Sequence, residues 1–385
     1  MTKTIHWWWC VAALMACVFA TSGLAAAATQ YVITNDDPDV TFYSVAPDGT
    51  LTLPQRLQIG GFGIVGGFFG ANRIATLNSG DQQCAFASIA SLGEIGEVSV
   101  PTLTVVGSVS GSPTDNGSAN GIGLAVNSQY LYASFTASNT IGTFQLEPGC
   151  NLIFVDDVSV SGFAGGFING MAIHGNMLIA TFTDGSIESF NISAGTPLTN
   201  ADEQYSTGTI ASRDASYPNS IDITKDGHYA IFGDTSTSMV VEVSDISSGK
   251  LAPTVVYTSK ASISSSNILL SPDETMLYVT NTQGDTVSAM FFDPASGKLS
   301  PGCTSGRIKG ESSNWSYLGG LALINKTGNG GGVYVAEFGG PSAIAMLTLN
   351  TSPGKCSLQE IGKSPFADPD SQALLSIGAF PPRDF

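Results

Sequence analysis

The chain has 385 residues, of which 43% are hydrophobic and 12% charged, and its formal net charge is −17. With 31 acidic residues against 14 basic ones, lysine and arginine are too sparse to form a phosphate-binding stripe, which excludes nucleic acid as the expected partner. The high apolar content excludes a disordered chain.

The first 28 residues differ in kind from the rest. A basic start precedes an apolar run from Trp7 to Ala20, and small residues follow as far as Ala28. This pattern predicts a signal peptide over residues 1–28, cleaved near Ala26 to Ala28, because the run is too short to span a bilayer. The alternative is lipidation at Cys17. We expect a secreted or periplasmic mature chain, residues 29–385, with no membrane span.

Four cysteines remain after removal of such a signal: Cys84, Cys150, Cys303 and Cys356. In an oxidising compartment they can form two disulfides, and their spacing leaves all three pairings open. No Cys-x-x-Cys motif or Cys/His cluster indicates zinc, so we predict neither a metal site nor a cofactor.

A repeated strand pattern organises the mature chain. Short apolar segments, each expected to be the second strand of a small sheet, recur at intervals of 43 to 57 residues. They are YVITN at Tyr31, IATLN at Ile74, LYASF at Leu131, LIATF at Leu178, YAIFG at Tyr229, LYVTN at Leu277 and VYVAE at Val333. Six are preceded by an apolar run that can serve as an innermost strand, near 63–71, 121–126, 170–173, 220–224, 268–271 and 318–324. The spacing predicts an all-β fold, one seven-bladed β-propeller domain (29–385) of four-stranded antiparallel blades.

The first of these segments lacks an inner partner, since the signal peptide lies directly before it. Residues 373–380 are mainly apolar, have the right length for an inner strand, and have no hairpin partner. We therefore predict that they pair with Tyr31 to Asn35 and close the ring, which removes exposed sheet edges. Within the repeat near Leu277, both faces of the sheet are apolar, so each sheet must be covered by its neighbours.

The segment LYVTN at Leu277, preceded by Ser271-Pro272-Asp273 and followed by Asp293-Pro294-Ala295-Ser296-Gly297-Lys298-Leu299, resembles the repeat of the YVTN and lactonase-like β-propeller superfamily. That superfamily includes 6-phosphogluconolactonases and carboxymuconate cyclases, so the resemblance implies a lactonase-type activity. Members with that activity typically carry Pro-Arg-His just before an inner strand. The corresponding positions of this chain, 118–120, 167–169, 217–219 and 265–267, lack this string, and no Arg-His pair occurs in the mature chain.

An asparagine recurs at the start of the inner strand in four consecutive blades, as Asn120, Asn169, Asn219 and Asn267. If the blades are radially equivalent, these carboxamides converge on one mouth of the channel and suit a neutral ligand rich in hydroxyl or carbonyl groups. The alternative is that each asparagine makes only a local turn into its strand.

The same mouth is expected to receive Arg213, Asp214 and Trp315. Arg213 with Asp214 or Glu203 is the set that a lactonase would use, and Trp315 would stack on a sugar or lactone ring. As alternatives, Arg213 and Asp214 form a surface pair, and Trp315 packs under a loop.

The two mature-chain histidines, His174 and His228, fall in turns between first and second strands, on the opposite face, so a Ser-His-Asp hydrolase is disfavoured. Aspartates expected in the turns between second and third strands could form an acidic rim, although aspartate is a common turn former. They are Asp36, Asp37, Asp81, Asp184, Asp234 and Asp285.

Two functional hypotheses follow. The first is an extracytoplasmic, monomeric binding module for a small polar ligand or an extracellular protein partner. The second, implied by the resemblance, is a lactone-ring hydrolase or related cyclase.

Overall fold

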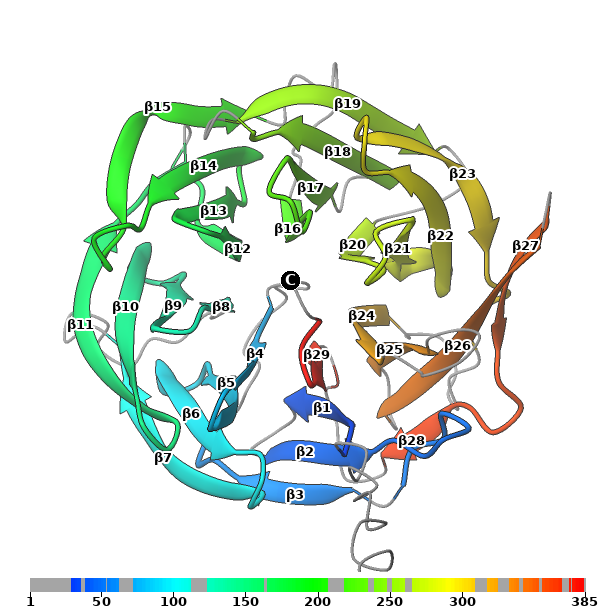
Figure 1. Cartoon of the computed structure of the whole chain (residues 1–385), viewed down its shortest axis with the longest axis horizontal. Coiled ribbons are helices and arrows are strands. Elements are labelled where there is room, and N and C mark those ends of the chain that lie inside the picture. Colours follow the sequence, from blue (N-terminus) through cyan, green and yellow to red (C-terminus); the bar gives the residue numbers. More distant parts are fainter. Residues whose placement is uncertain are drawn as a thin grey trace, which may run out of the picture.

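Seven small antiparallel sheets stand around a central axis like the blades of a propeller (Figure 1). The structure is a computed structural model that describes residues 29–35, 39–52, 54–61, 72–111, 123–162, 165–206, 218–234, 239–247, 251–259, 265–308, 317–324, 332–338, 342–352, 355–368, 374 and 376–383. Within these ranges the chain is all β apart from the one-turn helix η2 (Thr282–Gly284). None of the helical structure there has the length and hydropathy of a membrane span.

The strands of each blade follow one another from the centre of the ring outward. Blade 1 contains, in this order, β29 (Ser376–Phe380), β1 (Tyr31–Asn35), β2 (Asp39–Ser44) and β3 (Gln55–Gln58). Blade 2 contains β4 (Ile74–Ser79), β5 (Gln82–Ile89), β6 (Glu94–Ser99) and β7 (Thr104–Ser110). Blade 3 contains β8 (Leu124–Val126), β9 (Tyr130–Phe135), β10 (Thr140–Glu147) and β11 (Asn151–Ser159). Blade 4 contains β12 (Ile168–His174), β13 (Met177–Phe182), β14 (Ser186–Asn191) and β15 (Leu198–Ser206).

The remaining three blades have the same order. Blade 5 contains β16 (Pro218–Ile223), β17 (Tyr229–Asp234), β18 (Met239–Asp245) and β19 (Ala252–Ser259). Blade 6 contains β20 (Ser265–Leu270), β21 (Met276–Asn281), β22 (Thr286–Asp293) and β23 (Lys298–Thr304). Blade 7 contains β24 (Tyr317–Ile324), β25 (Gly332–Phe338), β26 (Ser342–Ser352) and β27 (Lys355–Glu360), and the short strand β28 (Phe366–Asp368) also pairs with β26.

The ring closes between the two ends of the chain, as predicted. β29 pairs antiparallel with β1 in a register that sets Tyr31 opposite Phe380 and Asn35 opposite Ser376. The C-terminal strand thus supplies the innermost strand of the blade that the N-terminal strands begin. Figure 1 shows the red β29 beside the blue β1, on the side of β1 that faces the centre of the ring.

The prediction for blade 2 was wrong by one strand. Ile74 begins β4, which is the innermost strand of its sheet, whereas we expected the second strand there. The second strand is β5, whose residues from Cys84 to Ile89 are all buried. Its sequence, rich in alanine and polar residues, lacks the aliphatic signature of the other second strands. The expected inner run at 63–71 lies outside the described residues.

Hydrophobic packing between neighbouring blades forms the core. Each of the seven clusters of buried apolar side chains joins two adjacent blades. On β21, Leu277 and Val279 pack against blade 5, while Met276 and Tyr278 pack against blade 7. Because successive side chains of a strand point to opposite faces, one strand contributes to two seams, and both faces of the sheet are apolar for this reason.

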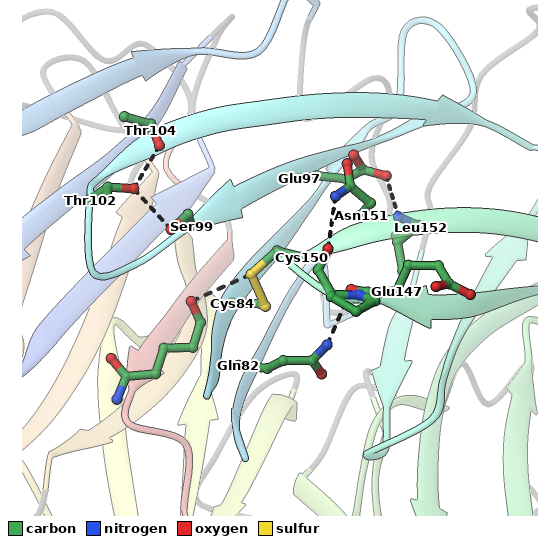
Figure 2. Close-up of a disulfide and its surroundings, with 12 residues drawn as sticks. Gln82, Cys84, Glu97, Ser99, Thr102, Thr104, Glu147, Cys150, Asn151 and Leu152 are labelled. Carbon is green, nitrogen blue, oxygen red and sulfur yellow. Dashed lines mark hydrogen bonds between the residues drawn. A yellow bond between two sulfur atoms is a disulfide. The ribbon is translucent and has the colours of Figure 1, made fainter. Parts of the chain in front are cut away.

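Two disulfides reinforce two of these seams. Cys84 on β5 pairs with Cys150 in the turn after β10, and Cys303 on β23 pairs with Cys356 on β27. The first joins blade 2 to blade 3 and the second joins blade 6 to blade 7, so each disulfide links two adjacent blades. Figure 2 shows the first of them beside the Glu97 carboxylate, which accepts a 2.8 Å hydrogen bond from the backbone N–H of Leu152 across the seam.

Candidate functional site

The innermost strands of the seven blades line a central channel. Each runs from the face where a loop arrives from the previous blade, called the loop face, to the face where a tight turn leads into the second strand, the turn face. Along this direction, described residues line a loop-face hollow and a turn-face hollow. The loop-face pocket measures about 60 Å³ and the turn-face cavity about 730 Å³.

Polar side chains gather in the loop-face pocket. Asn72, Asp222, Asn267 and Ser376 line it, together with the backbone around Gly320 and apolar residues of four innermost strands. They come from blades 2, 5, 6 and 1, so the ring geometry assembles groups that are far apart in the sequence. The pocket can offer amide, hydroxyl and carboxylate groups to a small polar ligand.

Asn267 has both a structural role and a place in the pocket. Its side-chain Nδ2 donates a 3.0 Å hydrogen bond to the carbonyl oxygen of Gly319 in the neighbouring blade, and its own N–H donates to Thr280 Oγ1 at 2.9 Å. The side chain is 5% exposed. The carboxamide therefore ties blade 6 to blade 7, and Asn267 also lines the pocket.

Asn72 was not predicted from the sequence. It lies directly before Arg73 and β4, is exposed, and lines both hollows. No hydrogen bond within the described residues engages its side-chain amide, whereas its backbone carbonyl accepts from the N–H of Leu124 at 2.6 Å. The error in blade 2 explains the omission: with Ile74 expected to begin a second strand, the asparagine before it did not stand at the entry to an inner strand.

The other predicted residues divide into three groups. Asn169 lies in β12, is 3% exposed and does not line the loop-face pocket; its backbone carbonyl accepts from Ser134 Oγ at 3.2 Å. The backbone of Asn219 lies in β16 and that of Glu203 lies in β15. Asn120, Arg213, Asp214 and Trp315 lie outside the described residues.

An ion pair across the channel was also missed by sequence reasoning. Arg383, three residues beyond β29, donates from Nη1 to Asp222 Oδ2 at 2.8 Å and from Nη2 to Asp222 Oδ1. The same carboxylate accepts from the N–H groups of Leu270 (2.8 Å) and Ile223 (2.9 Å). Arg383 Nη1 also donates to the Leu270 carbonyl at 2.7 Å. The two side chains are only 8% and 11% exposed, so the C-terminal tail is fastened inside the channel to blades 5 and 6.

Arg73 lies just before the inner strand β4, a position that the sequence analysis did not compare with the Pro-Arg-His string of the resembling family. Its side chain is 1% exposed, and burial lowers its pKa to about 10. Its backbone N–H donates to Ser376 Oγ at 3.3 Å, which links blade 2 to the closing strand. Arg73 lies outside the lining of both hollows, so its guanidinium is not presented to the channel.

The histidines and aspartates are dispersed. His228 lies in the turn after β16, as predicted, whereas His174 is the last residue of β12, directly before the turn. His174 lines the turn-face cavity, and His228 Nδ1 lies 3.3 Å from Asp226 Oδ2 at the surface. Asp184 and Asp285 lie in turns between second and third strands, where Asp184 accepts from the Ser186 N–H and Asp285 pairs with Arg307.

Asp81 follows β4, so it lies in a turn between first and second strands, which corrects its predicted position. Asp234 ends β17, and Asp36 and Asp37 lie outside the described residues. Over the part of the chain that the structure describes, no three His, Cys, Asp or Glu side chains come together as metal ligands would.

The fold and channel define a seven-bladed propeller of the lactonase type. The family model described as "Lactonase, 7-bladed beta-propeller" matches residues 167–369, which is more than half of the 385 residues. The chain therefore belongs to this family. No curated protein matches it by sequence.

Solved structures share the fold at low sequence identity. A candidate 6-phosphogluconolactonase from Bacteroides fragilis is 14% identical with a TM-score of 0.69, covering 92% of this chain and 99% of its own. A similar candidate from Bacteroides uniformis is 15% identical (TM-score 0.68; 91% and 99% covered). The periplasmic gluconolactonase PpgL of Pseudomonas aeruginosa is 13% identical (TM-score 0.66; 91% and 99% covered). At these identities the likeness concerns the fold alone.

Proposed function

We propose that this protein is an extracytoplasmic binding module that takes a small, hydroxyl-rich or lactone-like ligand at the loop-face end of its channel. The convergence of Asn72, Asn267 and Ser376 in one pocket carries the proposal, since these groups donate and accept hydrogen bonds without bearing charge. The pocket itself is small, so we expect it to hold one polar end of the ligand. Two disulfides support a location outside the cytoplasm.

The state of the pocket's carboxylate favours binding over catalysis. A general base for lactone hydrolysis needs a carboxylate that can accept a proton from water. Asp222 already accepts from Arg383 and from two backbone N–H groups, so its lone pairs are engaged. Arg383 is held in the same pair, and Arg73 does not reach the channel lining.

Lactone-ring hydrolysis is the second candidate. Membership of the lactonase family favours it, and Arg213 with Asp214 or Glu203 remains the set proposed to polarise the ring carbonyl and activate water. A pH-stat assay over a panel of γ- and δ-lactones tests this candidate directly. Turnover above background that disappears in Arg213→Ala would place hydrolysis above simple binding.

Thermal shift with the same lactones and their open-chain acids tests the binding proposal. A ligand at 100 times its Kd stabilises the folded state by about 2.7 kcal/mol. An unfolding entropy of about 2.1 cal/mol/K per residue, applied to 385 residues, converts this to a rise in Tm of roughly 3 °C.

The matched variants are Asn72→Ala, which removes an exposed pocket amide just before β4, and Asn78→Ala, which removes an exposed amide on β4 outside the lining of both hollows. We expect the shift to shrink in the first and persist in the second. Equal shifts in both variants would show that the ligand binds elsewhere.

A further inference from the structure

The turn-face cavity is a second, larger hollow with a different chemistry. Its volume of about 730 Å³ lies within the roughly 300–1,000 Å³ typical of small-molecule sites. All seven innermost strands contribute to its wall, and Pro382 and Arg383 of the C-terminal tail complete it. The two hollows share a layer of residues that includes Asp222, where the ion pair with Arg383 lies.

The wall of the cavity is mainly aliphatic. Val126, Ile173, Leu269 and Leu323, from blades 3, 4, 6 and 7, are each partly buried and line it. Each also packs against one of the clusters between blades. The surface that these side chains leave uncovered therefore faces the cavity and offers an apolar partner for a ligand.

Charge at the inner end of the cavity is neutralised. Asp222 and Arg383 are paired with each other at its inner end. Lys225 is exposed at the rim, where its backbone N–H donates to the Glu274 carboxylate of the next blade. His174, also at the rim, has its ring against the turn at Gly227. An ion carried to the inner end would lose its hydration, while the charges there are already paired with each other, which is costly.

Hydrogen-bonding capacity comes from the strand edges. Each innermost strand pairs with one neighbour only, so its other edge faces the channel with backbone N–H and C=O groups. Arg383 already uses the Leu270 carbonyl and Asp222 the Leu270 N–H, which shows that side chains can bind this edge.

We propose that the turn-face cavity is a binding site for a small, uncharged, mainly apolar molecule, aromatic or alicyclic, that carries one or two hydrogen-bonding groups. The aliphatic wall covers its body, and the strand edges bind its polar groups. This site lies beyond the layer of residues that it shares with the loop-face pocket, and it takes a ligand of a different class from the hydroxyl-rich one proposed there.

N-phenyl-1-naphthylamine is a suitable probe because it is uncharged and apolar, carries a single N–H, and gains fluorescence on leaving water. We expect saturable binding to the wild-type protein. Ala172→Phe on β12 and Leu323→Trp on β24 each place an aromatic ring in the cavity from a different blade. Each should weaken probe binding roughly tenfold or more, since the ring occupies volume that the probe needs.

The control is Val155→Trp on the outermost strand of blade 3, where the side chain is 46% exposed, and it should bind the probe as the wild type does. Circular dichroism and thermal unfolding identify any variant that fails to fold. If one of the two cavity-filling variants does not fold, the other still tests the proposal. An excess of glucono-δ-lactone should leave the probe bound. The proposal is overturned by absence of saturable binding, by unchanged affinity in a folded filling variant, or by displacement with the lactone.

Discussion

The Arg383–Asp222 pair should contribute measurably to the stability of the ring. Replacing Arg383 with Met keeps an apolar stem of similar length and removes the guanidinium. The Asp222 carboxylate, 11% exposed, then keeps its two backbone donors and loses its counter-ion. Removal of one partner from a buried pair costs about 3–5 kcal/mol, because the remaining charge stays buried without compensation.

This loss converts into a shift in Tm through the unfolding entropy. At about 2.1 cal/mol/K per residue, 385 residues give roughly 0.8 kcal/mol/K, so the expected fall in Tm for Arg383→Met is about 4–6 °C. Differential scanning calorimetry at neutral pH measures it. Asp222→Asn should destabilise by a similar amount, since it leaves the guanidinium buried without its partner charge.

The double variant isolates the interaction. If the two groups act as a pair, Arg383→Met combined with Asp222→Asn should cost less than the two single losses added together, because neither charge is then left buried alone. A Tm within about 1 °C of wild type for Arg383→Met, or strictly additive losses in the double variant, would refute the reasoning.

Three further outcomes are expected. Burial raises the pKa of Glu97, so the stability that its protonated form contributes is fully present below its ordinary value of 4.5 and is lost as the pH rises through the folded-state pKa. The Tm of Glu97→Gln minus the Tm of the wild type should therefore increase as the pH is raised from 4 to 7. Replacing both Cys84 and Cys150 with Ala opens a loop of 66 residues and should cost about 4 kcal/mol, or roughly 5 °C in Tm. Deletion of residues 376–385 removes β29 and leaves the inner edge of β1 unpaired, so we expect aggregation or loss of cooperative unfolding, measured by size-exclusion chromatography and calorimetry.

Each of these has a matched control. For Glu97→Gln the matched substitution is Glu147→Gln, which changes a partly exposed glutamate at the same seam. Reduction of the wild-type protein should lower its Tm as the double cysteine replacement does, provided that the reductant breaks the Cys84–Cys150 disulfide. Deletion of residues 384–385 alone, which leaves β29 and Arg383 in place, should be tolerated; a similar loss in both truncations would argue against closure by β29.

The architecture was largely determined by the sequence itself. The repeat near Leu277 alternates apolar residues to both sides of a strand, and such a sheet is stable only between two others, so a closed ring follows from the local pattern. The absence of an inner strand before Tyr31 and the unpaired apolar run 373–380 together predicted the closure that the structure shows. Blade 2 escaped this reasoning because β5 carries alanine and cysteine where other blades carry larger aliphatic residues.

The contents of the channel were decided by the tertiary structure alone. Asp222 and Arg383 are 161 residues apart, and no local pattern marks them as partners. Their meeting depends on the ring closing, on the tail turning inward after Phe380, and on the place of blade 5 across the channel from blade 1. The same holds for the disulfide pairing and for Asn72 beside Asn267. Periodicity reports which face of a strand is buried, whereas side-chain encounters across a closed ring depend on how all seven blades are arranged.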